Sequence, residues 1–402
     1  MRNLNQQSIK EANLKRTYNC IAKFDGISRV QLSKMMQLSK TTVSSLVDEL
    51  ISKKYIFDSG TVDSGNVGRN PNSLHLRKDS HFAICINWEA DSVTTYLTGL
   101  DGSFLKSVRF MNRKKDNCYL ELSLKGIHHL TDRQGIRNLV EFICIIIPGM
   151  INLGSGSIYT TQLYMAEEDQ KSILPKLKKA LAPYPLAFFN DTACYAYAEK
   201  ISDPIPVDDF VVFNFANGIG ATLFIRGQMI GQASGTFTQV GQVCINVPSY
   251  SKNKIFLENY IGEEALTERI KRYPQSTSLR ALKKVTYSDI EKARLNGDQV
   301  AFELWDSIVN EFTDVLANII TFVGVKLVIL GGRSRELGPD FPNAIHNKLE
   351  NNGYSRMTQH VKIRYSNLQS DSFVTGAVQY YMSEYYIITS KGKIKQDTSI
   401  EI

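Results

Sequence analysis

A short run of hydroxyl and lysine side chains has the chemistry to bind nucleic acid. Lys40, Thr41, Thr42, Ser44 and Ser45 lie within the six positions from 40 to 45. Their hydroxyl and ammonium groups can bond phosphate oxygens or base edges, and the threonine methyls can contact thymine. Because these side chains are small, a helix that presents them can enter a major groove about 12 Å wide. An ordinary solvated helix face is the alternative interpretation of this run taken alone.

Two predicted helices must position these side chains, after a longer helix from about Gln6 to Phe24. The second helix begins at Ser28, which together with Gln31 forms a Ser-x-x-Gln capping box. The third begins at Ser39, and its apolar residues recur at helical spacing: Val43, Leu46, Val47, Leu50 and Ile51. This arrangement is typical of a helix-turn-helix, in which the N-terminal part of the last helix meets the bases. We also include Arg29, at the start of the second helix, among the candidate DNA contacts.

A β-hairpin is predicted after the third helix. Tyr55–Phe57 and Ser73–Leu76 have the pattern of strands, and the residues between them are rich in turn formers. At the tip of this loop, Arg69 stands in the sequence Gly68-Arg69-Asn70-Pro71. An arginine on a glycine-flanked tip suits a narrow minor groove, where the electrostatic potential is most negative. The helices and this wing predict a winged helix-turn-helix DNA-binding domain over residues 1–78.

The net charge of the chain is concentrated in the same residues. Residues 1–78 contain 13 Lys and Arg against 6 Asp and Glu, whereas residues 79–402 contain 34 of each. The formal net charge of +7 therefore belongs entirely to the first fifth of the chain. A basic module joined to a neutral body favours an anionic polymer, here double-stranded DNA, as its partner. A chance imbalance of surface charge is the alternative.

The composition is that of an ordinary globular protein of two or three domains. The 402 residues are 43% hydrophobic and 22% charged, which excludes disorder throughout, collagen and a coiled coil. Six cysteines without a Cys-x-x-Cys pair indicate reduced thiols rather than a disulfide scaffold. The first residues lack the apolar core of a signal peptide, and the stretches Phe142–Ile147 and Ala317–Leu330 are predicted to be buried core, not membrane spans. We therefore expect a cytoplasmic protein.

The N-terminal motifs resemble the DNA-binding domain of ROK-family transcriptional repressors, which include xylose and N-acetylglucosamine repressors. The resemblance rests on the run from Ile27 to Leu50 and on Gly68-Arg69-Asn70-Pro71, although the family's wing usually ends in Gly-Arg-Pro. It implies a homodimer, or a tetramer, that binds a roughly palindromic operator with two recognition helices one helical turn or a multiple of it apart.

The rest of the chain is predicted to be a duplicated α/β body. Three strands between Phe82 and Phe110 are followed by helical patterns, and a similar unit recurs over residues 209–230. A long helix over Asp298–Phe322 leads into a strand and Gly331-Gly332, an arrangement that often borders a ligand cleft. From about residue 81 to 390 this resembles the actin-like ATPase fold of ROK sugar kinases and repressors. We divide the body into residues 79–200 and 201–390, followed by a polar tail, 391–402.

The resemblance implies a sugar site in this body. Asn190-Asp191 matches the family's Asn-Asp pair, whose aspartate is the general base in the kinases and binds a sugar hydroxyl. A carboxylate can accept two sugar hydroxyls and an amide both donates and accepts. The residues alone favour helix capping for this pair, and the resemblance favours the ligand role. Glu258 keeps another sugar-contacting position, whereas Gln239 and Gln242 stand where the family has Glu and His. Gly218-Ile219-Gly220 resembles the family's phosphate-cradling turn.

Departures from the kinase pattern argue against ATP and zinc. The kinases' Asp-x-Gly-x-Thr is replaced by Asn87, Glu89 and Asp91 at the three defining positions. Two carboxylates near a triphosphate repel it, so no productive ATP binding is predicted. The family's zinc-binding histidine is Gln242 here, and Cys244 is the only cysteine in that region, so the four ligands that structural zinc needs are not all present. We predict neither a cofactor nor a metal.

Together these features predict a DNA-binding regulator, a repressor of carbohydrate-utilisation genes, rather than an enzyme. A sugar or sugar phosphate at Asn190, Asp191 and Glu258 is expected to close the cleft between the two halves of the body and so change the spacing of the winged helices. An active sugar kinase that carries a DNA-binding domain is one alternative, supported by Asp191 alone. A repressor that has lost sugar sensing is the other. No membrane partner is expected.

Overall fold

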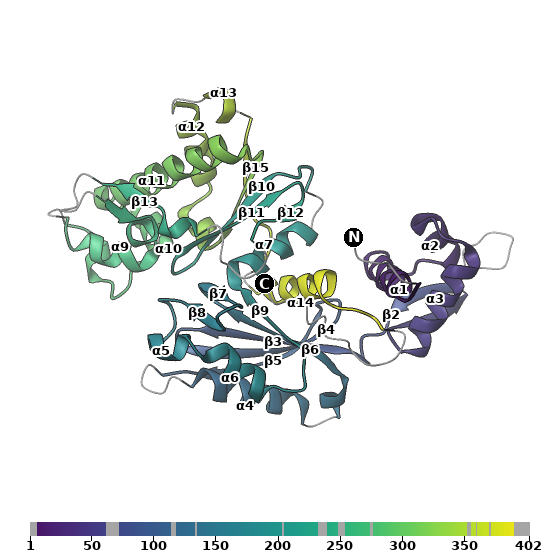
Figure 1. The fold of residues 1–402 in the computed structure, drawn as a ribbon. Coiled ribbons are helices and arrows are strands. Elements are labelled where there is room, and N and C mark those ends of the chain that lie inside the picture. Colours follow the sequence, from purple (N-terminus) through teal and green to yellow (C-terminus); the bar gives the residue numbers. More distant parts are fainter. Residues whose placement is uncertain are drawn as a thin grey trace. The chain divides into compact units, whose positions relative to one another are not determined.

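The computed structural model divides into two compact units (Figure 1). It describes residues 6–61, 72–113, 118–132, 135–202, 205–231, 239–247, 254–273, 276–351, 355–358, 360–369 and 371–389. The first unit contains the described parts of Met1–Ile146, Tyr164–Ala187 and Ala377–Ile402, and the second contains those of Ile147–Leu163 and Phe188–Gly376. Each unit groups residues that are in contact in space and so combines separate segments of the chain, whereas each domain predicted from the sequence is one continuous segment.

The three N-terminal helices form as predicted. α1 spans Gln6–Lys23, α2 spans Arg29–Met36 and α3 spans Lys40–Ser52. The capping box is confirmed, because the Ser28 hydroxyl accepts a bond from the Gln31 backbone N–H and the Gln31 side chain accepts one from the Ser28 N–H. The apolar stripe of α3 is buried except for its last residue, Ile51, which is half-buried at the helix end.

The two strands of the wing also form. β1, Ile56–Thr61, pairs antiparallel with β2, Asn72–Leu76, and Ile56 lies opposite Leu76. β1 extends four residues beyond the predicted end at Phe57. The loop tip and its predicted minor-groove contact, Arg69, lie outside the described residues.

A five-stranded sheet with the order β5-β4-β3-β6-β9 follows the wing. β3 (Phe82–Glu89), β4 (Ser92–Gly99) and β5 (Phe104–Met111) form an antiparallel meander, and β6 (Val140–Ile147) pairs parallel with β3. β9 is Leu186–Asn190. Residues 142–147 are buried in β6, as predicted, because an interior strand of this kind is covered on both faces.

The second sheet repeats this order with its own strands. β10 (Phe210–Phe215), β11 (Ile219–Ile225) and β12 (Gln228–Met229) form the antiparallel part, and β15 (Leu327–Gly332) pairs parallel with β10. β16 (Lys362–Tyr365) pairs parallel with β15. Each sheet therefore has three antiparallel strands, the last of which pairs parallel with the next strand, and the predicted duplication of the body is confirmed.

The long helix of the second unit, α11 (Gln299–Val323), packs against α10 (Tyr287–Leu295) and α12 (Phe341–Asn351) (Figure 1). Trp305 and Phe312 are buried, as their helical spacing predicts. The prediction that the whole stretch Ala317–Leu330 is core is wrong at Phe322, whose side chain is 93% exposed. The stretch combines the last turns of an amphipathic helix with a buried strand, and Phe322 lies on the open face of the helix.

The remaining elements connect and cover the two sheets. They are α4 (Tyr119–Thr131), β7 (Met150–Asn152), β8 (Ser157–Tyr159), α5 (Glu167–Gln170), α6 (Ile173–Ala180), α7 (Asp191–Ser202), β13 (Cys244–Asn246), β14 (Lys254–Phe256), α8 (Glu258–Ile261), α9 (Glu263–Ile270), α13 (Ser355–Thr358) and α14 (Ser372–Glu384). Within the described residues, no helix has the length and hydrophobicity needed to cross a bilayer.

Candidate functional site

The N-terminal half of α3 presents the predicted DNA-contacting side chains. Lys40, Thr41, Thr42 and Ser45 are exposed, and Ser44 is half-buried. The Ser39 hydroxyl caps the helix by accepting a bond from the Thr42 backbone N–H at 3.1 Å. Because the opposite stripe of α3 is buried, this polar face is held outward at the start of the helix.

Arg29 joins α2 to α3 within the protein. Its guanidinium donates to the Ser44 carbonyl at 3.2 Å and forms an ion pair with Asp48 at 2.8 Å. Asp48 is exposed and Arg29 is half-buried, so the pair lies at the surface of the helix-turn-helix. Arg29 therefore braces the two helices against each other, and its predicted contact with DNA stays a prediction.

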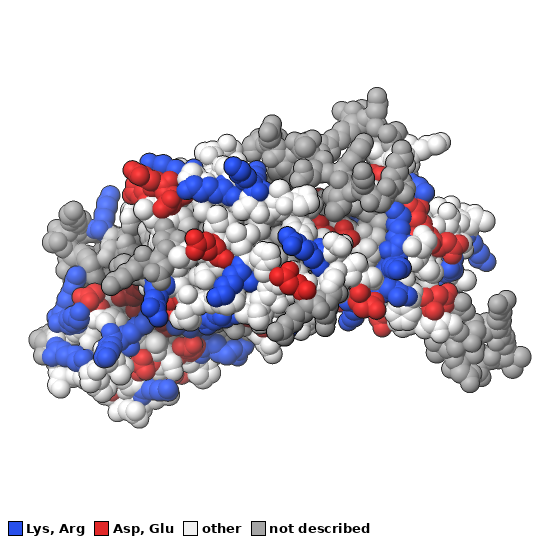
Figure 2. Space-filling model, turned by 90° about the horizontal axis from the view of Figure 1, so that it is seen from below, with Lys and Arg blue, Asp and Glu red and all other residues white. Residues whose placement is uncertain are grey.

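Figure 2 shows one face of the molecule, on which Lys and Arg side chains lie among Asp and Glu side chains. Along the chain, residues 79–402 contain equal numbers of positive and negative residues. The excess positive charge therefore remains a property of residues 1–78.

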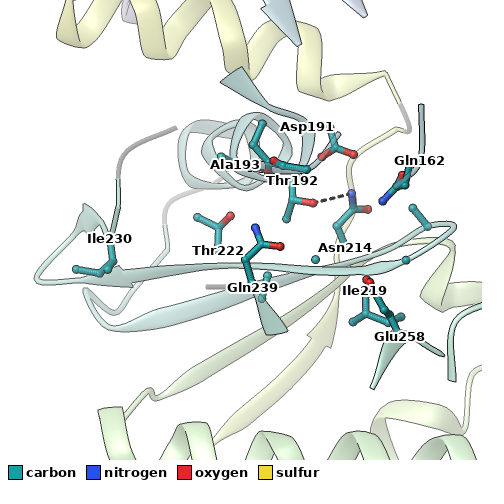
Figure 3. Close-up of a pocket in the computed structure, with 16 residues that line it drawn as sticks. Gln162, Asp191, Thr192, Ala193, Asn214, Ile219, Thr222, Ile230, Gln239 and Glu258 are labelled. Carbon is teal, nitrogen blue, oxygen red and sulfur yellow. Dashed lines mark hydrogen bonds between the residues drawn. The ribbon is translucent and has the colours of Figure 1, made fainter. Parts of the chain in front are cut away.

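A pocket in the second unit collects most of the predicted sugar-binding residues (Figure 3). Its cavity volume is about 60 Å³, which is smaller than the few hundred Å³ that small-molecule sites usually have. Asn190, Asp191, Gln239 and Glu258 line it, together with Gly149, Gln162, Thr192, Ala193, Asn214, Ala216, Gly218, Ile219, Gly220, Ala221, Thr222 and Ile230. The fifth predicted residue, Gln242, is exposed and bonds to Glu258 rather than lining the pocket.

The Asn190 side chain organises the pocket from within. It lies at the end of β9, where its amide donates to the Gly149 carbonyl at 2.8 Å. Its Oδ1 accepts a bond from the Ala193 backbone N–H at 3.0 Å, so Asn190 also caps α7. Asn190 therefore both caps α7 and lines the pocket. Because its side-chain amide already makes these two bonds within the protein, the predicted sugar contact is expected mainly from Asp191.

Asp191 is the first residue of α7 and a carboxylate of the pocket. Burial raises the pKa of Asp191 to about 6, and hydrogen bonds from backbone N–H groups, including that of Thr192, limit the rise. Thr192 accepts a bond from the Asn214 amide at 3.3 Å, and Figure 3 shows these two side chains beside Asp191. A carboxylate so placed can accept hydroxyl protons of a polyol or act as a general base.

Glu258, at the start of α8, is the second carboxylate of the pocket. It accepts bonds from the Ile219 backbone N–H and from the Gln242 side-chain amide. Burial raises the pKa of Glu258, and these two bonds oppose the rise. A Cβ added at Gly218 would lie 2.8 Å from a Glu258 carboxylate oxygen, so the glycine turn and the carboxylate are in direct contact.

Four further polar residues of the pocket were not predicted from the sequence: the hydroxyl residues Thr192 and Thr222, and the amide residues Gln162 and Asn214. Asn214 is the only polar residue of β10, whose sequence is FVVFNF, and it stands four residues before Gly218 of the glycine turn. A lone amide at the end of an apolar strand is a signal that could have identified it. Gln162 lies in a loop without a recognisable pattern, and nothing in the sequence distinguishes it from an ordinary surface glutamine.

The residues that replace the kinase motif form a surface ion-pair group. Glu89 and Asp91 lie 3.3 Å and 3.5 Å from the Arg109 guanidinium, and all three side chains are largely exposed. Asn87 is buried in β3. Arg109 offsets part of the negative charge, so repulsion of a triphosphate is weaker than the two carboxylates alone indicate.

The region where the family has its zinc site contains Gln242 and Cys244 among its described residues. Cys244 on β13 lies opposite Phe256 on β14, and Gln242 bonds to Glu258. Among the described residues, no three His, Cys, Asp or Glu side chains are grouped closely enough to hold a metal ion.

Comparison with known proteins supports the resemblance noted in the sequence. The model of the ROK family matches residues 83–383. The xylose repressor of Bacillus subtilis is 25% identical over 378 residues, which cover 92% of this chain and 95% of the relative. A crystal structure of a ROK-family transcriptional regulator, a homologue of the Escherichia coli Mlc protein, superposes with a TM-score of 0.75 at 20% identity, over 92% of this chain and 96% of its own.

A kinase-like structure shares the fold of the body but covers less of the chain. The putative N-acetylmannosamine kinase of Listeria monocytogenes superposes with a TM-score of 0.60 at 18% identity, over 75% of this chain and 99% of its own. The match to the family model extends over most of the chain. The chain therefore belongs to the ROK family, and it is related to the xylose repressors and to the Mlc and NagC transcriptional regulators.

Proposed function

We propose that this chain is a transcriptional repressor that binds operator DNA through α2 and α3 and releases it when a sugar occupies the pocket of the second unit. It acts in the cytoplasm as a homodimer, because a palindromic operator requires two copies of the recognition helix. Its target genes serve carbohydrate use, in keeping with the names of its xylose-repressor relatives.

The observation that carries the DNA-binding part is the exposed face of α3. Small hydroxyl side chains and Lys40 lie on it, and a buried apolar stripe fixes the face outward. The repressor relative covers 92% of the chain, which includes this region, whereas the kinase structure covers 75%. The similarity to repressors thus extends beyond the part shared with kinases.

The sugar-control part is supported by the chemistry of the pocket. Its polar lining consists of carboxylates, amides and hydroxyls, which are the groups that recognise sugar hydroxyls. A sugar can shift DNA binding only by binding one conformation of the protein more tightly than the other. A bound sugar is therefore expected to favour the conformation with the lower operator affinity.

Fluorescence anisotropy on a labelled duplex from upstream of the gene tests both parts. Unlabelled random duplex serves as the competitor, and a panel of sugars is titrated into the complex. Lys40→Ala is expected to weaken specific binding several-fold, whereas Lys178→Ala, an exposed lysine of α6, serves as the matched control. Equal operator affinity for Lys40→Ala and wild type would exclude Lys40 and its face of α3 from the DNA interface. Operator binding that no sugar changes would exclude a sugar-sensing role for the pocket.

An active sugar kinase is the second candidate, favoured by Asp191 in the pocket. Against it, Asn87, Glu89 and Asp91 replace the three defining residues of the kinases' Asp-x-Gly-x-Thr motif. ADP release with a sugar panel, compared between wild type and Asp191→Asn, decides between the two. Sugar-dependent release that the substitution abolishes would establish the kinase.

A further inference from the structure

The segment where the family binds zinc does not supply the donor atoms of such a site. A structural zinc ion takes four nitrogen or sulfur ligands in a tetrahedron. No histidine stands between residues 130 and 345, and Cys244 is the one cysteine after residue 194. Cys244 is exposed, and the residue opposite it across the ribbon of β13 and β14 is Phe256. A lone thiol cannot hold the ion, so the residues present do not fit zinc.

Hydrogen bonds join the two segments that the family's zinc would join. The resemblance places one ligand at Gln242 and another at Phe256, directly before Leu257. Here the Leu257 backbone N–H donates to the Val243 carbonyl at 2.9 Å. The Gln242 side-chain amide donates to the carboxylate of Glu258. The residue that replaces the histidine ligand thus bonds to the same neighbouring segment.

Apolar packing fixes the ribbon from its inner face. Side chains alternate along a strand, so the cross-strand pair Ile245 and Ile255 lies on the face opposite to Cys244. Ile245 is 7% exposed and belongs to a buried apolar cluster of the second unit, against which Ile255 packs. Leu257, directly after β14, is fully buried in the same cluster. The ribbon is therefore anchored in the core by side chains that bind no metal.

The short 3₁₀ helix η3 (Val240–Gln242) is docked on the glycine turn by its backbone. A Cβ added at Gly241 would lie 2.7 Å from the Ile219 carbonyl oxygen, closer than a real carbon can approach. A Cβ at Gly262, after α8, would lie 3.1 Å from the Asn217 carbonyl oxygen. Glycine thus lets the segments on both sides of the ribbon pack directly on the turn, so direct contact fixes their positions.

We propose that this chain keeps the family's zinc segment folded without a metal ion, because Gln242 and the β13–β14 ribbon take the place of zinc. Gln242 braces the segment by its bond to Glu258, and the inner face of the ribbon supplies the rest of the cross-link. Operator binding therefore keeps its response to sugar when zinc is withheld. Folding without zinc does not depend on the proposed function, so metal content and thermal stability test it without DNA or sugar.

Metal analysis of the full chain, expressed with added zinc and purified without a chelator, is the first test. Elemental mass spectrometry is expected to find far less than one zinc ion per chain. The midpoint of thermal unfolding should be the same with EDTA, with added zinc and with neither. Cys244→Ser removes the one thiol of the segment and should change neither quantity. A stoichiometric zinc content that Cys244→Ser abolishes, or a midpoint that EDTA lowers, overturns the proposal.

Two substitutions test the contacts that replace the ion. Gln242→Leu removes the bond to Glu258 and should lower the unfolding midpoint by about 2–4 °C. Ile245→Ala removes buried apolar contacts and should lower it by about 5–15 °C. Gln228→Leu, at an exposed glutamine of β12, and Asn246→Ala, at an exposed residue of β13, are the matched controls. Neither control should change the midpoint.

A double substitution isolates the bond of Gln242. In a Glu258→Ala background, Gln242→Leu should lower the midpoint no further, because its partner is already gone. Gln242→Lys keeps a donor opposite the carboxylate and should restore the wild-type midpoint. A loss that persists in the Glu258→Ala background, or that Gln242→Lys does not recover, overturns the role of Gln242.

The ribbon is tested separately from Gln242. An unfolding midpoint that Ile245→Ala does not lower overturns the part of the ribbon. If Ile245→Ala does not fold, Ile245→Val, which removes one methyl group, should show a smaller loss in the same direction. A wild-type chain that binds no operator would overturn the proposed function and leave these stability results unchanged.

Discussion

Asp191 is the residue at which ligand binding and stability oppose each other. Burial raises the pKa of its carboxyl from 3.8 to about 6, so the ionised form is less favourable in the folded chain than in the unfolded chain. The destabilisation grows as the pH rises from about 4 and is complete above about 6. We therefore expect Asp191→Asn to raise the free energy of unfolding by about 1–3 kcal/mol at pH 7.5 and to change it little at pH 3.5. Denaturant titrations at the two pH values measure this difference.

The same substitution should abolish the response to sugar, because a neutral amide accepts fewer hydroxyl bonds than a carboxylate. Asp79→Asn, an exposed aspartate in a turn, is the control and should change neither quantity. An equal stabilisation at both pH values would show that burial of the charge is not its cause. A preserved sugar response would exclude Asp191 from the binding site.

At the residue scale, the sequence predicted the charged part of the pocket better than the neutral part. Asp191 and Glu258 stand in motifs with a recognisable order, and both line the pocket. Gln162 and Asn214 are brought there by a loop and by the end of a strand, and their spacing along the chain says nothing of this proximity. The motif predicted Gln242 as a residue of the site, but its side chain does not line the pocket and instead hydrogen-bonds to Glu258, which does.

At the element scale, the stability of α3 determines whether its polar face is presented. Leu50 is fully buried, while the neighbouring Ile51 is half-buried. Leu50→Ala should therefore destabilise the winged helix-turn-helix by about 2–5 kcal/mol, and Ile51→Ala by clearly less. Hydrogen exchange of the α3 amides in the full chain measures both. Equal exchange rates in the two variants would contradict the assigned packing of the helix.

Helical periodicity predicted which elements form but not how far each apolar stripe is covered. Trp305 and Phe312 of α11 are buried, whereas Phe302, at the same helical spacing, is half exposed. The period of the apolar residues determines which face of a helix is apolar. The lengths of the neighbouring elements determine how much of that face is buried. The first strand of the wing was predicted too short for a similar reason, because the length of β1 depends on how far its partner β2 pairs with it.

At the scale of the whole molecule, the separation of charge predicts how salt acts on the two ligands. The +7 excess lies in residues 1–78, and the pocket of the second unit is lined by carboxylates and neutral groups. Each phosphate neutralised by the protein contributes about −0.9 to the slope of log affinity against log salt concentration. We expect a steep slope for the operator, reduced by about one in Lys40→Ala, and a slope near zero for the sugar.

Anisotropy titrations at roughly 50 to 300 mM salt measure the slope for the operator. Calorimetry in the same buffers measures the slope for the sugar. An operator slope that Lys40→Ala leaves unchanged would mean that Lys40 makes no phosphate contact, whatever its effect on affinity. A free-sugar affinity that falls with salt would mean that charge interactions contribute to binding, which contradicts a site of hydroxyl hydrogen bonds. One salt series therefore tests the DNA-binding surface and the proposed sugar site, because the chain keeps its excess charge and this pocket in different parts.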